Sequence, residues 1–130
     1  MNAYPEKQHY TADDLAAIIA ILRDPDNGCP WDKVETHRSI RMNFLEEAYE
    51  AVDAIDLDDP ELLCEELGDV LFAAVKAARF AGVDPEDALN AACEKFIRRY
   101  GAVEQGARDR GVSVSDLTLE EMTGLWNAAK

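Results

Sequence analysis

The sequence lacks positive charge over its central part, because no Lys, Arg or His occurs from Met42 to Val75 in a chain of 130 residues. The net charge of the whole chain is −14. A solvated helix surface normally mixes the two signs, since like charges one turn apart destabilise a helix by roughly 0.2–0.5 kcal/mol per pair. We therefore expect a cation from outside the chain, such as a metal ion, to compensate the acids of this stretch. These acids are Glu46, Glu47, Glu50, Asp53, Asp56, Asp58, Asp59, Glu61, Glu65, Glu66 and Asp69.

Other absences exclude several classes of protein. No apolar run approaches the ~20 residues that cross a bilayer, and the N-terminus has no hydrophobic signal region. The strongly negative net charge argues against binding to a nucleic acid polymer or to an anionic membrane. Cys29, Cys64 and Cys93 are odd in number and have no CxxC spacing, so they indicate reduced, buried thiols rather than disulfides or a zinc site. These observations predict a cytoplasmic protein.

The composition, 48% hydrophobic and 31% charged, is typical of one globular domain. We predict that residues 1–130 form this domain, with residues 1–10 as a flexible tail. Periodicity and capping signals predict an all-α fold of five helices and no strand. Helix starts are indicated by Thr11 with Asp14, by Asp59 with Pro60 and by a capping box from Thr118 to Glu121, and Gly82 indicates the end of the third helix. Because the connections are short, the helices should form an antiparallel bundle of four to five members. The predicted helices span about 12–22, 39–55, 60–80, 85–100 and a short segment from Thr118, and residues 23–33 are predicted to be a loop.

Two of the predicted helices carry pairs of acids beside their apolar stripes. Glu47 lies at the edge of the stripe of the second helix, with Glu50 one turn further on. Glu66 should be partly buried on the third helix, and Asp69 follows it by three residues. In antiparallel packing the two helices would bring four oxygen donors together, which suits Mg²⁺ or Mn²⁺. The alternative is that all four acids belong to solvated surfaces.

The remaining charged residues of these two helices should point to solvent. On the second helix Glu46 lies opposite the apolar stripe, and on the third helix Glu65, Glu61 and Lys76 share a polar side. The apolar stripes themselves are predicted to be buried. Their members are Phe44, Ala48, Ala51, Val52 and Ile55 on the second helix, and Leu63, Leu67, Val70, Leu71, Ala74, Ala77 and Ala78 on the third.

Basic and aromatic residues form a second group of candidates. Lys95 and Arg99 share one flank of the fourth helix, with Arg98 a little further round, and this group could neutralise phosphate oxygens. Equally, basic residues near a helix C-terminus can simply complement the helix dipole. Trp31 and Trp126 could each stack on a base or cover one end of the bundle. The predicted core stripe of the fourth helix consists of Ala88, Leu89, Ala92, Phe96 and Tyr100.

Four segments, GCPWDKVETHRSI, LEEAYEAVDAI, EELGDVLF and EKFIRRY, occur in this order in the chain. From about Leu22 to Tyr100 the sequence resembles the MazG-type nucleoside triphosphate pyrophosphohydrolases, and the closing EEMTGLWNAAK is also similar to the C-termini of that family. The resemblance implies an all-α fold that assembles as a homodimer or higher oligomer. It also implies cleavage of nucleoside triphosphates to monophosphates and pyrophosphate.

The resemblance assigns roles to individual residues. Glu47 and Glu50 match the first pair of metal ligands of the family, and Glu66 and Asp69 match the second pair. Lys95 and Arg99 match the basic pair that contacts phosphate, and Trp126 matches a tryptophan near the site. The sequence departs from the family pattern at two positions, where Glu35 stands in place of Gln and Cys93 in place of an Asn found in some members.

Together these observations predict an Mg²⁺-dependent hydrolase in which a metal-activated water attacks the α-phosphorus. Glu46 or a metal-ligating residue such as Glu47 would accept the proton. The substrate would contact five further residues, namely Lys95, Arg98, Arg99, Trp31 and Trp126. Two alternatives remain open: a catalytically silent helical dimer that binds nucleotides or a protein, and a narrower pyrophosphatase for dUTP or phosphoribosyl-ATP.

Overall fold

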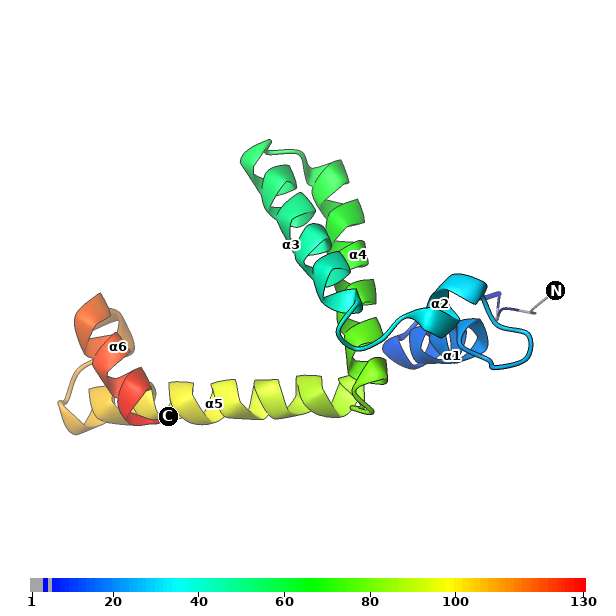
Figure 1. The fold of residues 1–130 in the computed structure, drawn as a ribbon. Helices are drawn as coiled ribbons and strands as arrows, with labels where there is room; N and C mark the ends of the chain where they lie inside the picture. Colours follow the sequence, from blue (N-terminus) through cyan, green and yellow to red (C-terminus); the bar gives the residue numbers. More distant parts are fainter. Residues whose placement is uncertain (1–3, 5) are drawn as a thin grey trace. The chain divides into compact units, whose positions relative to one another are not determined.

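The chain is entirely α-helical in the computed structural model, which describes residue 4 and residues 6–130 and contains no strand among them. It forms two compact units, Met1–Glu86 and Asp87–Lys130, which are described separately (Figure 1). The predicted flexible tail, residues 1–10, falls partly on residues 1–3 and 5, which lie outside the described residues. Within the described chain, no helix combines the length and the apolar character that a bilayer span requires.

The first unit contains four helices whose ends follow the predicted capping signals closely. Thr11 and Asp14 form a capping box at the start of the first helix, and the Asp59 carboxylate caps the fourth, with Pro60 at its first position. Gly82, at φ 67°, follows the end of that helix, as predicted. The helices are α1 (Ala12–Leu22), α2 (Pro30–Val34), α3 (Ile40–Asp56) and α4 (Pro60–Phe80).

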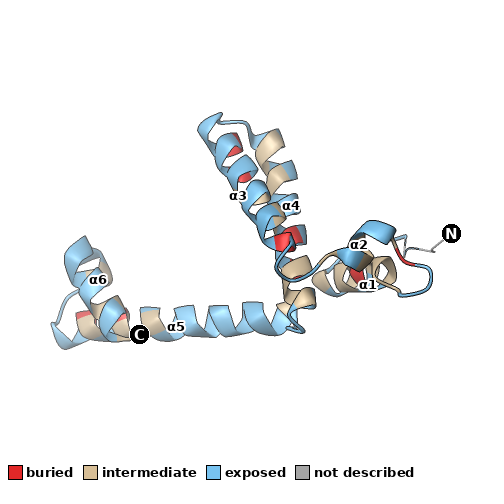
Figure 2. Ribbon diagram, in the orientation of Figure 1, coloured by how far each residue is buried: buried red, intermediate tan, exposed pale blue. Residues whose placement is uncertain are grey.

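Helices α3 and α4 pack side by side as an antiparallel pair, and α4 also contacts α1 (Figure 1). Small side chains are buried on these helices, where Ala51 and Ala54 lie on α3 and Ala73 lies on α4 (Figure 2). Small residues let the two backbones approach closely. The connection between them is short, and Asp58 adopts a left-handed backbone conformation at φ 53°. The prediction of an antiparallel α3–α4 pair is therefore confirmed.

The apolar stripes of α3 and α4 are only partly buried, which corrects the prediction that they form a closed core. In the described chain α3 packs mainly against α4, which covers only one part of its stripe. The burial centres on Ala51 and on Ala54, a residue that the predicted stripe did not include. The large side chains left exposed on these helices include Phe44, Val52, Ile55, Leu67 and Leu71.

The second unit is built from α5 (Pro85–Asp109, of which residues 87–109 belong to this unit), a 3₁₀ turn (Val114–Asp116) and α6 (Leu119–Ala128). Its core contains Val103, Ala107 and Leu117, with partly buried residues of α6 packed against them. Gly106 permits close packing of α6, because a Cβ atom there would lie 2.5 Å from Leu125 Cδ2. The predicted capping box of the last helix, from Thr118 to Glu121, is confirmed.

Two helix predictions were wrong, and tertiary contacts explain both. The five-residue helix α2 falls on the predicted loop, residues 23–33, and ends one residue beyond it. The side chains of Arg23, directly after α1, and Lys76 of α4 bind this segment. Helix α5 continues past Tyr100 to Asp109, although Gly101 and Gly106 disfavour a helix. The apolar residues Val103 and Ala107 extend the stripe of α5 and pack in the core of the second unit, which compensates for the two glycines.

Several residues predicted to be buried are exposed. Leu89, Phe96 and Tyr100 of α5 are 60%, 58% and 41% exposed in the described chain, so the predicted core stripe of this helix is not covered. Cys64 and Cys93 are exposed, and Cys29 is half-buried, which corrects their assignment as buried apolar groups; all three thiols are free.

Candidate metal centre

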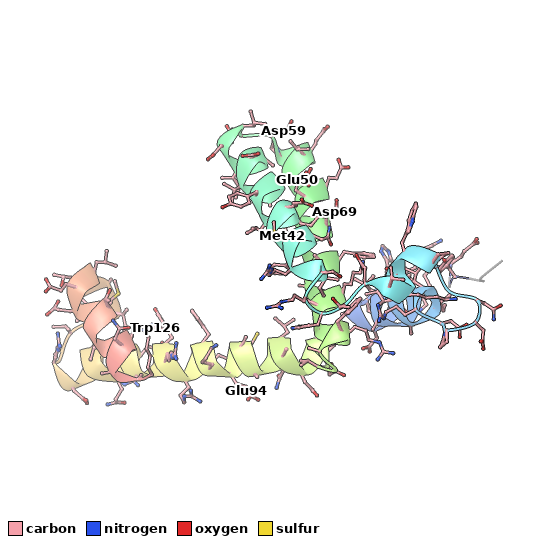
Figure 3. All side chains as sticks on the ribbon, viewed as in Figure 1. Met42, Glu50, Asp59, Asp69, Glu94 and Trp126 are labelled. Atoms are coloured by element: carbon pink, nitrogen blue, oxygen red, sulfur yellow. The ribbon has the colours of Figure 1, made fainter. Side chains whose placement is uncertain are left out.

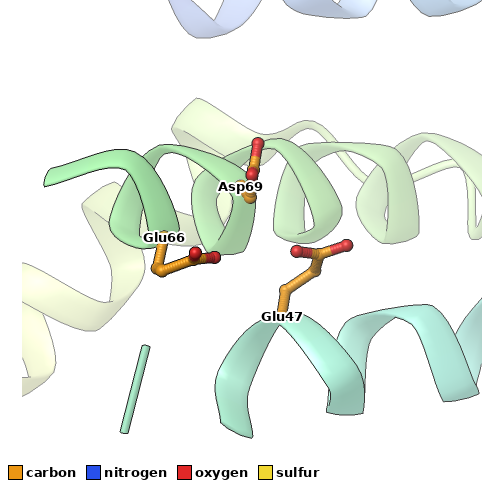
Figure 4. A group of neighbouring side chains, drawn as sticks. All are labelled: Glu47, Glu66 and Asp69. Carbon is orange, nitrogen blue, oxygen red and sulfur yellow. The ribbon is translucent and has the colours of Figure 1, made fainter. Parts of the chain in front are cut away.

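The acids of α3 and α4 meet on the facing sides of the two helices. Glu47 of α3 and Glu66 and Asp69 of α4 each offer one carboxylate oxygen, and these three oxygens lie within 4.8 Å of one another (Figure 4). Glu47 and Glu66 are half-buried, as predicted for residues at the edge of an apolar stripe, and Asp69 is exposed. We call these three residues the acid cluster.

The symmetry of the α3–α4 connection brings these residues together. Asp58 is equally far in sequence from Glu47 and Asp69, and equally far from Glu50 and Glu66. An antiparallel pair that turns at Asp58 therefore sets each acid of α3 opposite an acid of α4. The cap at the start of α4 and the left-handed conformation of Asp58 fix this turn.

Glu50, the fourth predicted ligand, lies close to the cluster without joining it. It is exposed on α3, one turn from Glu47, and Figure 3 labels it together with Asp69. Its charge is the strongest of the neighbouring charges that act on Glu66. The structure thus brings three of the four predicted ligands together and places the fourth beside Glu66. Glu46 is exposed, in agreement with its predicted position opposite the apolar stripe.

The electrostatic setting of Glu66 differs from that of an ordinary surface glutamate. Burial raises the pKa of the Glu66 carboxyl, and the nearby negative charges, led by Glu50, raise it further. The ion pairs found in the described part of the chain use other acids, namely Asp14, Asp32, Glu35 and Glu121. The cluster therefore carries negative charge that no side chain described here neutralises by an ion pair.

One residue of the site was missed by the sequence analysis. Asn43 of α3 donates a hydrogen bond from Nδ2 to Glu47 Oε1 at 2.8 Å. The two residues are four apart on one helix, the spacing at which side chains meet, and this signal was available in the sequence. The bond orients the Glu47 carboxylate, as outer-shell partners do for metal ligands.

The predicted basic and aromatic residues lie mainly in the second unit. Lys95 and Arg98 are exposed on α5, whereas Arg99 is half-buried, with its guanidinium carbon 5.6 Å from the ring centre of Trp126. Trp126 on α6, labelled in Figure 3, also lies 5.4 Å from the ring of Phe96. The Nε atom of Arg99 is buried and has no hydrogen-bond partner among the described residues, so it remains available as a donor.

Trp31 lies in the first unit, on α2, and is 83% exposed. Of its two predicted roles, covering one end of the helices is not seen in the described chain. An exposed indole beside a turn is suited to stacking on a planar ligand. Glu35, the departure from the family pattern, follows α2 and forms an ion pair with Lys76.

Comparisons with known proteins identify the family to which the chain is related. The sequence profile described as "MazG nucleotide pyrophosphohydrolase domain" matches residues 35–103. The chain is 44% identical over 92 residues to a nucleoside triphosphate pyrophosphohydrolase of Escherichia coli, which corresponds to 68% of this chain and 35% of that protein. It is 39% identical over 92 residues to a nucleoside triphosphate pyrophosphohydrolase/pyrophosphatase MazG of Thermotoga maritima, covering 68% of the chain and 36% of the relative.

A third relative extends the match over almost the whole sequence. A nucleoside triphosphate pyrophosphohydrolase of Mycolicibacterium smegmatis is 31% identical over 134 aligned residues, which cover 98% of this chain and 38% of that protein. The chain thus spans little more than a third of the length of these three relatives. The profile match covers more than half of the chain and includes both acid pairs and the basic run of α5. The chain therefore belongs to the MazG nucleotide pyrophosphohydrolase family.

Proposed function

We propose that the chain is an Mg²⁺-dependent nucleoside triphosphate pyrophosphohydrolase, which converts a nucleoside or deoxynucleoside triphosphate to the monophosphate and pyrophosphate. The observation that carries the proposal is the acid cluster, in which carboxylates from two helices converge without a neutralising ion pair. Three relatives named as nucleoside triphosphate pyrophosphohydrolases support the choice of reaction. We further propose that the two units act together as one functional domain.

The donor set fits a hard divalent cation. Glu47, Glu66 and Asp69 would hold Mg²⁺, with Glu50 as a fourth acid beside them, and Mn²⁺ is the expected substitute. The raised pKa of Glu66 shows that the site resists a full complement of negative charge, which a cation would relieve. When bound, Mg²⁺ would neutralise triphosphate oxygens and lower the pKa of a coordinated water.

The residues of the chain supply positioning and proton transfer. Hydrolysis adds water to the α-phosphorus and breaks the bond to the bridging oxygen, so that pyrophosphate leaves. The proton of the water passes to a carboxylate, for which Glu46 and Glu47 are the candidates. Lys95 and Arg99, with Arg98 nearby, would bind the phosphates, and the unpartnered Nε of Arg99 supports this role.

Trp31 and Trp126 are the proposed contacts for the base. Trp31 is almost fully exposed, and Trp126 is part of an aromatic group with Phe96 and Tyr100. Aromatic side chains stack on nucleobases with little dependence on sequence, which suits an enzyme that accepts several nucleotides.

We also propose that the chain assembles as a homo-oligomer, a dimer or a tetramer. Large apolar residues are exposed on α3 and α4, among them Phe44, Ile55 and Leu71, and they support this proposal because a partner chain could cover them. Light scattering of the purified protein should give a mass at least twice the 14.4 kDa of one chain. A monomer at micromolar concentration would contradict this part of the proposal.

A panel of nucleotides tests the proposed reaction. The protein is incubated with each nucleoside and deoxynucleoside triphosphate, and separately with dUTP and phosphoribosyl-ATP, with and without Mg²⁺. Monophosphate plus pyrophosphate that appear only with metal would support the reaction and rank the bases. Diphosphate plus orthophosphate would show that a different bond is cut. Saturable Mg²⁺ binding without turnover of any nucleotide would favour a silent binding module.

A further inference from the structure

Lys76 occupies a position that the sequence analysis assigned to solvent, and this assignment was wrong. Its side chain is only 14% exposed, and its Nζ lies 2.6 Å from Glu35 Oε2 and 3.2 Å from Asp32 Oδ1. Burial alone would lower the pKa of Lys76, but the contacts that its ammonium group makes with these two carboxylates raise the pKa above its ordinary value. Lys76 is thus a firmly charged group that joins α4 to the segment around α2.

Arg23, which directly follows α1, binds the main chain of the same segment. One guanidinium nitrogen donates to the carbonyl oxygen of Asp32 and, at 3.2 Å, to that of Glu35. The guanidinium also lies 3.9 Å from the centre of the Phe80 ring, near the end of α4. Two cations, Lys76 on α4 and Arg23 directly after α1, therefore contact Asp32 and Glu35. We call these contacts of Lys76 and Arg23 the cationic clamp.

The segment needs such contacts because it is not stable by itself. Helix α2 has five residues, far fewer than an isolated helix requires in water, and Cys29 at its N-cap makes no side-chain hydrogen bond. The local sequence alone is therefore insufficient to explain the helix, and the contacts of the cationic clamp supply the missing stabilisation. Trp31 lies directly beside Asp32 and is 83% exposed, so the clamp fixes the helix without covering the indole.

The clamp also fixes where this segment lies relative to the acid cluster. Asp69 and Lys76 are seven residues apart on α4, which places them on the same side of the helix and roughly 10 Å apart along its axis. That separation is within the reach of a nucleoside triphosphate, in which the ribose links the phosphates to the base. A nucleotide whose phosphates lie at the acid cluster could therefore reach the clamped segment with its base.

We infer that Lys76, together with Glu35, is a positioning residue for the nucleotide: the pair holds α2 so that Trp31 forms one wall of the base site. This inference rests on the proposed function. Lys76 does not touch the reacting atoms and acts through Trp31. Its loss should therefore weaken nucleotide binding, while the binding of Mg²⁺ to the acid cluster and the chemical step stay nearly unchanged.

The first test is the Lys76→Met variant, with Arg79→Met as its matched control. Arg79 lies one turn further along α4, is exposed, and carries the same charge. In Lys76→Met, hydrogen exchange of the amides of residues 29–36 should become about tenfold faster, as expected when a charge-assisted hydrogen bond is lost. KM should rise by about the same factor, whereas kcat and Mg²⁺ affinity should change less than twofold. Arg79→Met should change none of these quantities.

A charge swap keeps the test valid if Lys76→Met folds poorly. Glu35→Lys and Lys76→Glu each place like charges together, and each should raise KM. The double variant restores an opposite pair at positions 35 and 76, while Asp32 then faces a carboxylate at position 76, so its KM and its amide exchange should return part of the way to those of the wild type. Glu35→Gln, which keeps the shape and removes the charge, should give an intermediate effect.

The outcomes separate this inference from the proposed function. If the wild type hydrolyses nucleotides and Lys76→Met has the same KM, the positioning role is refuted while the proposed function stands. Unchanged amide exchange in the variant would show that the clamp does not hold α2. If the wild type neither hydrolyses nor binds any nucleotide of the panel, the proposed function fails, and the positioning role fails with it.

Discussion

Two groups of carboxylates flank different parts of α4, and the chain treats them in opposite ways. Asp32 and Glu35 share Lys76, whose Nζ lies within 3.2 Å of both. Glu47, Glu66 and Asp69 each place one carboxylate oxygen within 4.8 Å of the others, yet no ion pair with a described residue neutralises them. Partly buried like charges are costly unless something compensates them. The first group is neutralised by a cation of the chain itself, while the second has carboxylate oxygens that could hold a metal ion.

The largest effect should come from Glu66→Gln, which makes the two groups more alike by removing one uncompensated charge. Mg²⁺ affinity and turnover should each fall at least about a hundredfold, because even outer-shell changes cost 10–100-fold. In the absence of Mg²⁺ the variant should melt at a higher temperature than the wild type, since burial and like charges disfavour the ionised Glu66. Calorimetric titration with Mg²⁺ and thermal melts measure the two effects.

Glu65→Gln is the matched control for this variant. Glu65 is the neighbouring residue on α4 and is exposed, and its charge is one of those that raise the pKa of Glu66. The same change there should therefore shift metal affinity and melting temperature in the same direction as Glu66→Gln, but by much less. A wild-type level of turnover in Glu66→Gln would refute the assignment of the acid cluster as the metal site.

Lys76→Met should remove the cation that Asp32 and Glu35 share, so that these two carboxylates, like those of the acid cluster, lack a neutralising ion pair. Loss of the shared cation leaves Asp32 and Glu35 close together and partly buried. We expect the free energy of unfolding to fall by about 1–2 kcal/mol, the effect of removing a hydrogen-bonded charged partner. Denaturant titration measures this change, and a stability equal to that of the wild type would show that the ion group contributes nothing to the fold.

Asn43→Ala should sharpen the comparison by disturbing the acid cluster without changing its charge. The variant loses the 2.8 Å hydrogen bond to Glu47, so that this carboxylate can rotate away from α4. Mg²⁺ affinity should fall by about tenfold, the lower end of the range for outer-shell partners of metal ligands. Because no charge is removed, the melting temperature without metal should not rise, in contrast to Glu66→Gln.

The ionised forms of Glu66 and Lys76 should affect the free energy of unfolding with opposite signs, and both effects should be small. The folded-state pKa of Glu66 is raised, so its unfavourable contribution is present at neutral pH and disappears as the pH falls through that pKa toward 4.5, its ordinary value. The stability advantage of Glu66→Gln in metal-free protein should therefore shrink on acidification.

The contribution of Lys76 has the opposite dependence. Its folded-state pKa is raised above the ordinary 10.5, so its stabilising effect is fully present below pH 10.5 and is lost as the pH rises through the folded value. The deficit of Lys76→Met relative to the wild type should stay constant from pH 6 to about pH 9 and shrink in more alkaline solution. Melts from about pH 4 to about pH 11, beyond the ordinary pKa values of 4.5 and 10.5, test both trends.

Local signals in the sequence were sufficient for much of the fold. The capping boxes begun by Thr11 and Thr118, and the Asp59 cap with Pro60, placed three helix starts correctly, because caps depend on residues within one turn. Helical periodicity likewise placed Glu66 at the edge of the apolar stripe, where the structure finds it half-buried. The side-by-side arrangement of the acids followed from a short connection between two long helices.

What the sequence could not indicate depends on contacts between distant residues. Helix α2 was predicted to be a loop because its contacts come from Arg23 and Lys76, which lie on other helices. Lys76 was assigned to solvent because a helical projection cannot show that two carboxylates would cover it. Asn43 is different, since its spacing from Glu47 was visible and was not used. The exposed apolar residues of α3 show that a stripe predicts burial without identifying what covers it.

The spacing between Asp58 and the acids limits where the length of this chain can vary. Surface connections normally tolerate insertions and deletions at little thermodynamic cost. The two helices do not, because each acid of α3 and its counterpart on α4 are counted from the same residue. One extra residue within α4, between Pro60 and Glu66, would rotate Glu66 and Asp69 by about 100° relative to the residues before it while leaving the helix intact. Such a chain would keep every acidic residue and its helical content, yet it would have no site at which they meet.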